Sequence, residues 1–213
     1  MFSALEALER LKEGNRRFVS GIRYHSAFHQ THRSQLISGQ EPFAVIIGCS
    51  DSRVPVEIIF DQGLGDLFVI RVAGNIVAPS QIGSVEFAIE QFGTRLVVVL
   101  GHTRCGAVNA TLQQLQQPVE SQSKNMHSIV NRIRPAVENL LETDLKYDLK
   151  TLAKQAIRAN VRISANHLRY GSEVIERMIQ DHGLLVVGAE YSLKTGIVDF
   201  FDGMPTKADY FKE

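Results

Sequence analysis

The sequence predicts an α/β fold with a mainly parallel central sheet of about four strands, flanked by helices. Short apolar runs rich in β-branched residues alternate with longer stretches in which apolar residues recur at helical spacing. Strands that alternate with helices indicate a mainly parallel sheet covered on both faces. A chain of 213 residues, 44% of them hydrophobic, fits one domain with a substantial core.

The order of these patterns along the chain defines the expected elements. The predicted strands cover residues 43–48, 66–72, 95–100 and 184–187. The predicted helices cover 2–18, a short segment near 31–38, 84–92, 106–117, 123–141 and 149–181, the last interrupted at Gly171. A C-terminal hairpin-like extension is expected at 191–201, turning at 194–196. We therefore expect a single domain, 1–213, with an N-terminal helical arm, 1–40, and an α/β core, 41–213.

Charge and hydropathy exclude several classes of partner. The 23 Lys and Arg residues balance 23 Asp and Glu residues, so nothing in the net charge favours nucleic acid or an anionic membrane surface. The longest apolar runs are far short of the roughly 20 residues that a membrane-spanning helix needs. The N-terminal residues lack the uninterrupted apolar core of a signal peptide. We expect a cytoplasmic protein whose two cysteines stay reduced.

Two cysteines and one histidine follow the ends of two predicted strands. Cys49 follows the first strand, and His102 and Cys105, three residues apart, follow the third. Ligands of open α/β sheets bind outside the carboxyl ends of the strands. Two thiolates and one imidazole suit Zn²⁺, and three protein ligands with an open fourth position are typical of catalytic zinc. The alternative is that the cysteines are small buried hydrophobic residues and His102 an ordinary polar one.

Asp51 and Arg53 follow the first of these cysteines closely. Asp51 is a candidate fourth ligand, a hydrogen-bond acceptor for metal-bound water, or a surface charge. Arg53 could hold this carboxylate in a bidentate pair and keep it ionised. The fourth position would then hold a water whose pKa the zinc lowers towards neutrality. A local salt bridge that caps the turn is the alternative interpretation.

These motifs resemble those of the β-class carbonic anhydrases. The resemblance runs from about residue 4 to 203 and is carried by segments 49–55 (Cys-Ser-Asp-Ser-Arg-Val-Pro), 71–75 (Arg-Val-Ala-Gly-Asn), 83–88 and 102–106 (His-Thr-Arg-Cys-Gly). It implies a lyase that reversibly hydrates carbon dioxide to bicarbonate and a proton, on zinc held by Cys49, His102 and Cys105. It also implies that the Asp51–Arg53 dyad keeps the fourth zinc position open. A homodimer or homotetramer with the active site at the subunit interface is implied as well.

Three further residues match the substrate cleft of this family. Gln40 corresponds to a glutamine that donates a hydrogen bond to substrate, and Phe68 and Phe87 match an aromatic wall that shelters carbon dioxide. Core packing would also explain the two phenylalanines. A small apolar gas needs a mostly apolar pocket with few polar groups, which agrees with these residue types.

A second, regulatory bicarbonate site occurs in some members of the family and is matched here only in part. Arg71 and Tyr191 correspond to two of its residues. Ile46 stands where the third residue, a tryptophan, is expected, and the chain contains no tryptophan. Loss of the indole N–H donor argues against this site.

The N-terminal arm contains two further patterns. The helix at 2–18 has an apolar face with no obvious core in its own chain. The resemblance implies that this helix reaches across to a partner subunit, so that removing residues 1–18 should weaken the dimer. Three histidines lie close together in the loop that follows, and a solvated segment is favoured there over a second metal site: His25, His29 and His32.

Two other functions would use the same zinc ligands. Hydrolysis of carbonyl sulfide or carbon disulfide needs the same zinc shell, so the motifs do not separate it from carbon dioxide hydration. A non-catalytic, zinc-stabilised binding protein would need neither Asp51 nor Arg53. The presence of both residues argues against that third function.

Overall fold

Five strands form one central sheet in the computed structural model of the chain, which describes residues 2–22, 34, 36–117 and 123–205. The strands are β1 (Ala44–Gly48), β2 (Leu67–Arg71), β3 (Leu96–His102), β4 (Leu185–Tyr191) and β5 (Val198–Asp202). Their order across the sheet is β2-β1-β3-β4-β5. The first four are parallel, and β5 runs antiparallel to β4. The expected mainly parallel sheet with a C-terminal hairpin is confirmed.

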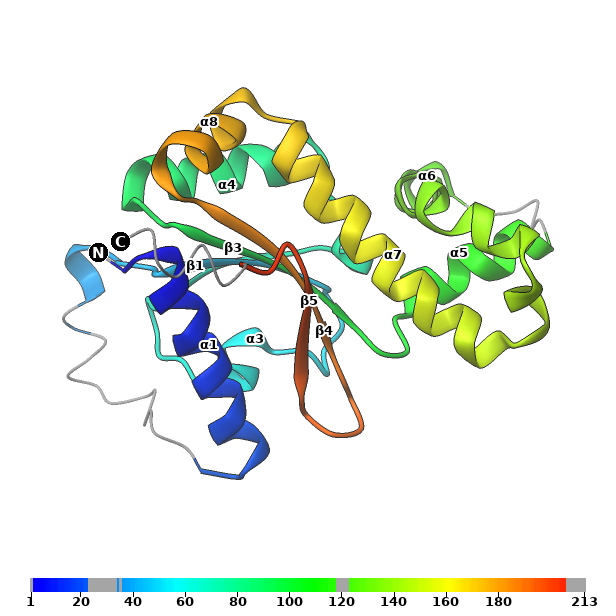
Figure 1. The fold of residues 1–213 in the computed structure, drawn as a ribbon, viewed down its shortest axis with the longest axis horizontal. Coiled ribbons are helices and arrows are strands. Elements are labelled where there is room, and N and C mark those ends of the chain that lie inside the picture. Colours follow the sequence, from blue (N-terminus) through cyan, green and yellow to red (C-terminus); the bar gives the residue numbers. More distant parts are fainter. Residues whose placement is uncertain (1, 23–33, 35, 118–122, 206–213) are drawn as a thin grey trace.

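Helices cover both faces of this sheet (Figure 1). One face packs against α1 (Ala4–Val19) and α3 (Val56–Ile59). The other face packs against α4 (Pro79–Phe92), α7 (Leu149–Tyr170) and α8 (Glu173–His182). Two more helices, α5 (Gly106–Gln116) and α6 (Lys124–Val137), pack on each other and on α7. Short 3-10 helices are η1 (Leu36–Ser38), η2 (Ala73–Asn75), η3 (Glu138–Glu142) and η4 (Asp144–Tyr147).

The two central strands lie next to each other although they are not consecutive in sequence. Every residue of β1 and of β3 is buried, as expected for parallel strands covered on both faces. In the parallel register Gly48 of β1 lies opposite Leu100 of β3. The residues that follow β1 and those that end β3 therefore emerge at the same edge of the sheet.

Several element boundaries differ from those expected. The helix expected at 84–92 begins earlier, at Pro79, because proline is well suited to the first helical turn. The third strand extends beyond its apolar run to His102, which pairs with Tyr191 of β4. The break expected at Gly171 is confirmed, since it separates α7 from α8. Three histidines lie outside the described residues: His25, His29 and His32.

The apolar face of α1 packs on the sheet of its own chain, which corrects the expectation that it has no core there. Ala7, Leu8 and Leu11 are fully buried in the cluster formed with β1 and β3. Gly14 permits this close packing, because a Cβ there would lie only 1.8 Å from the carbonyl oxygen of Phe60. The physical argument for a helix that reaches across to another subunit is therefore removed.

A buried amide fixes α1 to two other parts of the chain. The Nδ2 of Asn15 donates to the carbonyl oxygens of Ile59 and Gly196, at 3.2 and 2.9 Å. Its Oδ1 accepts a hydrogen bond from the N–H of Val198, at 2.9 Å. The helix is thus joined to α3 and to the β4–β5 hairpin, as an integral part of the domain.

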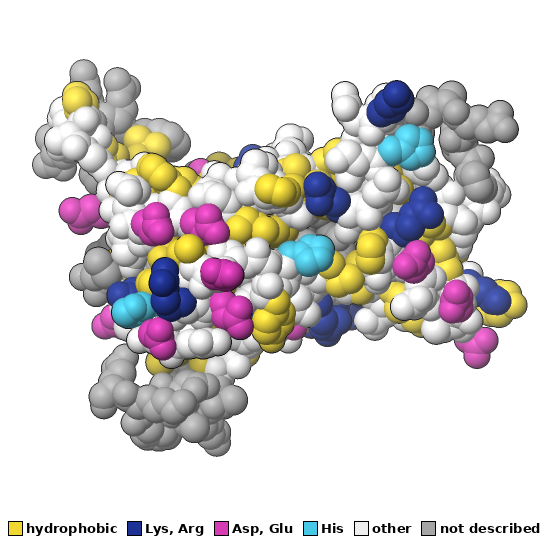
Figure 2. All heavy atoms as spheres, turned by 90° about the horizontal axis from the view of Figure 1, so that it is seen from above, with side chains coloured by type: hydrophobic (Ala, Val, Ile, Leu, Met, Phe, Trp, Pro, Cys, Tyr) yellow, Lys and Arg dark blue, Asp and Glu magenta, His cyan; other side chains and the backbone are white. Residues whose placement is uncertain are grey.

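The molecular surface carries both signs of charge. On the face formed by α4, α7 and α8, acidic side chains gather over α4 and α8, whereas Lys and Arg side chains are scattered towards α5 and α6 (Figure 2). This view gives no sign of the single basic stripe that marks many nucleic-acid-binding surfaces. Within the described residues, no helix combines the length and the apolar character needed to cross a bilayer.

We expect Leu8→Ala to lower the free energy of unfolding by about 2–5 kcal/mol, because it leaves a cavity between α1 and the sheet. Chemical denaturation monitored by circular dichroism measures this change. Leu149→Ala is the matched control, since Leu149 is 66% exposed. Equal effects of the two substitutions would contradict the packing of α1 on its own chain.

Candidate metal centre

Cys49, His102 and Cys105 converge at the carboxyl ends of β1 and β3. Their ligand atoms, two Sγ atoms and an imidazole nitrogen, all lie within 4.8 Å of one another, and all three residues are buried. No other group of three or more such ligands occurs among the described residues. The three residues that the sequence singles out are therefore the ones that the fold brings together.

Each of the three ligands is positioned by a different piece of local structure. Cys49 directly follows β1, His102 is the last residue of β3, and Cys105 is the N-cap residue of α5. Arg104, between the last two, has a left-handed φ of 59° that reverses the chain towards α5. The Cys105 sulfur therefore lies at the N-terminus of α5, a position that favours a thiolate.

The imidazole of His102 is oriented to offer one nitrogen to a metal. Its Nδ1 lies 3.0 Å from the carbonyl oxygen of Thr103, which assigns the proton to Nδ1 and the lone pair to Nε2. Nε2 is buried and has no hydrogen-bond partner. A buried, unpartnered imidazole nitrogen beside two thiols fits a soft-to-borderline divalent metal such as zinc.

The closeness of the two thiols separates their pKa values. The neighbouring Cys105 lowers the pKa of the Cys49 thiol, and the hydrogen bond from the N–H of Gly74 lowers it further against the effect of burial. The neighbouring Cys49, together with burial, raises the pKa of Cys105. The pair therefore favours one thiolate and one thiol. A metal cation would favour ionisation of both.

Asp51 and Arg53 form a bidentate pair beside the ligands. Nε and Nη2 of Arg53 donate to the two carboxylate oxygens of Asp51 at 2.9 and 2.7 Å, and the Arg53 N–H donates to Oδ1 at 3.0 Å. The Arg53 guanidinium holds the pKa of the Asp51 carboxyl well below its usual range. Oδ2 of Asp51 lies 3.9 Å from Nε2 of His102. An ionised carboxylate is thus held next to the metal ligands.

Arg71 supports the loop that carries Cys49 and Asp51. Its Nε donates to the carbonyl oxygen of Cys49 at 2.9 Å, and its Nη2 donates to that of Asp51 at 2.5 Å. Tyr191 is buried on β4, with its ring 6.5 Å from the ring of Phe18. Two strands, β1 and β3, separate Arg71 on β2 from Tyr191 on β4. The regulatory site, which Ile46 at the tryptophan position makes doubtful, stays a prediction.

Phe68 and Phe87 belong to an aromatic cluster between β2 and α4. Together with Phe92 they form three ring contacts with centroids 5.8 to 6.2 Å apart. Phe68 lies opposite Val45, four residues before Cys49, so its backbone is about 13 Å from that of Cys49 along the strand direction. Phe87 is 52% exposed, which is high for a phenylalanine next to a core.

Gln40 lies at the opposite end of β1 from Cys49. It is exposed and lines a surface cavity of about 410 Å³ together with Pro42, Phe92 and Arg95. Within one chain, the glutamine and the two phenylalanines of the expected cleft are therefore separated from the metal ligands.

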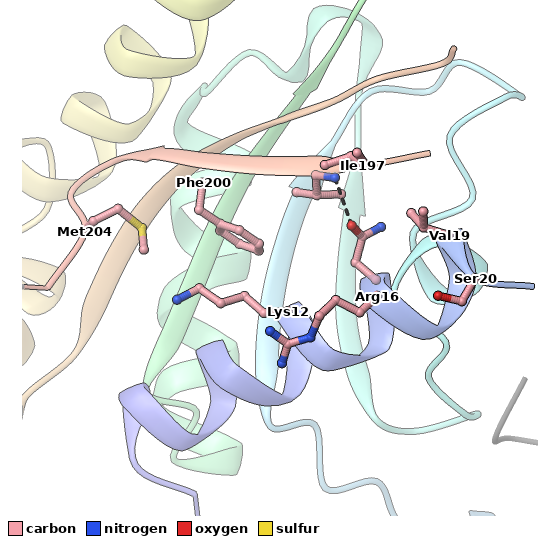
Figure 3. Close-up of a pocket in the computed structure, with 9 residues that line it drawn as sticks. Lys12, Arg16, Val19, Ser20, Ile197, Phe200 and Met204 are labelled. Atoms are coloured by element: carbon pink, nitrogen blue, oxygen red, sulfur yellow. Dashed lines mark hydrogen bonds between the residues drawn. The ribbon is translucent and has the colours of Figure 1, made fainter. Parts of the chain in front are cut away.

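A further cavity lies between α1 and β5, at a different place on the molecule (Figure 3). It measures about 630 Å³ and is lined by the stems of Lys12 and Arg16, by Val19, and by Phe200 and Met204 across from them. None of the residues that line it is a Cys, His, Asp or Glu. It offers no metal-ligand chemistry, so the candidate site remains the Cys49–His102–Cys105 cluster.

Sequence reasoning overlooked the backbone donor that serves Cys49. The N–H of Gly74, in η2, donates to the Cys49 sulfur at 3.3 Å. Gly74 and Asn75 both have left-handed φ values, 69° and 43°. The Gly-Asn pair was a detectable signal, because these two residue types are the ones that favour that conformation in turns.

Comparison with known proteins agrees with this site. A family model for carbonic anhydrase matches residues 44–198, a range that includes all three metal-ligand candidates. Carbonic anhydrase 2 of Mycobacterium tuberculosis is 40% identical over 190 residues, which cover 89% of each chain. The solved β-carbonic anhydrase CafA of Aspergillus fumigatus superposes with a TM-score of 0.73 at 26% identity, covering 95% of this chain and 92% of that one. The chain belongs to the β-class carbonic anhydrase family.

Other members of the family extend the comparison. The tetrameric β-carbonic anhydrases of Sordaria macrospora match with a TM-score of 0.72 at 26% identity, over 81% of this chain and 87% of that one. A carbonic anhydrase of Pseudomonas aeruginosa is 33% identical over 186 residues, 80% of each chain. The expectation of a carbonic anhydrase, drawn from the motifs, is confirmed.

We expect His102→Gln to abolish stoichiometric zinc binding, because the amide cannot replace the imidazole nitrogen as a strong ligand. Elemental analysis of the purified variants measures the zinc content. His167→Gln is the matched control, since His167 is exposed on α7 and outside the cluster. A full complement of zinc in His102→Gln would contradict the proposed ligand set.

Proposed function

We propose that this protein catalyses the reversible hydration of carbon dioxide to bicarbonate and a proton, with zinc held by Cys49, His102 and Cys105. The observation that carries the proposal is the buried, unpartnered Nε2 of His102 beside two thiols and an Arg-held carboxylate. Zinc bound by three protein ligands supplies a Lewis acid that lowers the pKa of a coordinated water to near 7.

Asp51 is the residue that we propose as the hydrogen-bond acceptor for water at this site. Arg53 donates to both of its oxygens, which keeps the carboxylate ionised and holds it in the ion pair. Oδ2 still faces the ligand cluster, 3.9 Å from Nε2 of His102. With a metal bound by the three ligands, Asp51 would be suited to accept a hydrogen bond from a water beside the cluster and to orient it, rather than to act as a fourth ligand.

We further propose that a second copy of the chain completes the substrate cleft. Gln40, Phe68 and Phe87 lie away from the ligands of their own chain, at the side of the sheet where β2 is the edge strand. The exposed ring of Phe87 and the tetrameric relatives from Sordaria macrospora support an oligomer in which these residues serve a neighbouring site. A homodimer is the smallest assembly that would do so, and a homotetramer would contain two such pairs.

We also propose a cytoplasmic location. Both cysteines are free and buried in the ligand cluster. Thiolate ligands persist in a reducing compartment, which supports the location expected from the sequence.

The proposed reaction is tested by measuring carbon dioxide hydration with stopped-flow indicator kinetics on the zinc-loaded protein, after chelation, and after zinc is restored. We expect activity to disappear with the metal and to return with it. Sulfide release from carbonyl sulfide and carbon disulfide, assayed on the same samples, separates the alternative hydrolase. Zinc-dependent sulfide release without carbon dioxide hydration would overturn the proposal, as would full activity after complete chelation.

Asp51→Asn is expected to reduce kcat/KM for carbon dioxide hydration by about a hundredfold or more, because the amide is a poor proton acceptor and loses the ionic pair with Arg53. Zinc content should stay near one ion per chain, since Asp51 is not one of the three ligands. Asp181→Asn, at the end of α8, is the matched control and should keep wild-type kinetics. An Asp51→Asn variant as active as the control would remove Asp51 from the mechanism.

Phe87→Glu is expected to weaken the oligomer and to lower carbon dioxide hydration in parallel, because it places a charge on the aromatic cluster proposed to meet the second copy. Sedimentation velocity over a range of protein concentrations measures the assembly. Tyr147→Glu is the control, since Tyr147 is 79% exposed at a site away from β2. An unchanged oligomer with full activity would argue against the shared cleft.

A further inference from the structure

Asn160 is a buried polar residue in the middle of α7. It is only 1% exposed, and its helical neighbours Ile157 and Val161 are buried apolar residues. Its Nδ2 donates to the carbonyl oxygen of Gly74 at 2.8 Å. A buried amide is unfavourable unless it is hydrogen-bonded, so an aliphatic side chain would suit this position better if packing were its only role.

The turn at Gly74 and Asn75, to which Asn160 donates its hydrogen bond, is enclosed by neighbouring helices. Gly74 has φ 69° and ψ 20°, and Asn75 follows with a second left-handed φ of 43°. A Cβ at Gly74 would lie 2.8 Å from Cδ1 of Ile133 in α6 and 3.0 Å from Cβ of Ala107 in α5. The turn is therefore enclosed by α5 and α6, and α7 provides the hydrogen bond through Asn160.

The opposite side of the same turn faces the metal ligands. The N–H of Gly74 donates to the sulfur of Cys49 at 3.3 Å. Gly74 therefore accepts a hydrogen bond from α7 through its carbonyl oxygen and donates one to a metal-ligand candidate through its N–H. The direction of that N–H depends on the left-handed backbone conformation that the Asn160 bond helps to maintain.

We propose that Asn160 is a positioning residue for the zinc site, acting through Gly74 on the Cys49 thiolate. The inference rests on the proposed function, since it concerns the same metal. The N–H···S bond disperses thiolate charge and fixes the direction of the sulfur lone pairs. Without the bond from Asn160, the strained turn relaxes, the N–H turns away from the sulfur, and the zinc is held less tightly.

The test compares zinc affinity in the wild-type chain, Asn160→Leu, Asn160→Asp and Ser164→Ala. Leucine preserves volume without a donor, and aspartate presents oxygen atoms to the Gly74 carbonyl. Ser164 is a buried polar residue one turn further along α7, so it controls for changes to the helix itself. Competition with a chromophoric chelator gives the dissociation constant. Cobalt-substituted protein gives the sulfur-to-metal charge-transfer band, which reports on the thiolate directly.

We expect about tenfold weaker zinc binding in both Asn160 variants, with an altered charge-transfer band. Ser164→Ala should match the wild-type chain in both measurements. The rise in melting temperature caused by zinc, measured within each variant, separates a loss of metal affinity from a general loss of stability. We expect this rise to be smaller in the Asn160 variants than in Ser164→Ala.

Three results would overturn the inference. The first is wild-type zinc affinity and an unaltered cobalt spectrum in either Asn160 variant. The second is failure of both variants to fold, which would assign Asn160 to folding itself. The third is absence of zinc binding by the wild-type chain, which would overturn the proposed function as well. Zinc binding without carbon dioxide hydration would overturn the proposed reaction alone, and the affinity comparison would still decide the role of Asn160.

Discussion

The parallel pairing of β1 with β3 is the constraint on which the rest of the site depends. These strands are separated in sequence by β2 and α4, yet their register places the residue before Cys49 opposite the end of the apolar run that leads to His102. The residue that follows β1 and the few residues at and after the end of β3 then bring an imidazole and two thiols together. A shift of that register by one residue would move one thiol by about 3.3 Å and reverse its direction.

The metal ligands depend in turn on polar groups that are buried or half-buried around them. Arg71 holds the carbonyl groups of the loop that carries Cys49, and Arg53 holds the carboxylate beside it. The carbonyl oxygen of Thr103 orients the histidine, and the N–H of Gly74 donates to the sulfur of Cys49. Each of these interactions uses a backbone group or a charge that would be costly to leave unpaired. Together these interactions fix the positions of the three candidate ligands relative to one another.

The metal-ligand cluster and the expected substrate cleft differ in how completely a single chain forms them. The ligand cluster and the Asp51–Arg53 pair are assembled within a single chain, from β1, β3 and the loops after them. Gln40 precedes β1, Phe68 lies on β2 opposite Val45, and Phe87 lies on α4 in contact with Phe68. Under the proposal that a second copy completes the cleft, the substrate pocket would depend on assembly, whereas the metal-ligand cluster would not.

Periodicity in the sequence determined which apolar runs form strands and where helices lie between them, because these depend on local pattern. Residue chemistry and spacing identified Cys49, His102 and Cys105 as metal-ligand candidates. They did not reveal that α1 packs on its own sheet, since the packing depends on the approach of Gly14 to Phe60 across the fold. Nor did they reveal the bond from Asn160 to Gly74, which joins residues 86 positions apart. Contacts of that kind leave no periodic signal, so only the tertiary structure decided how the ligands are held.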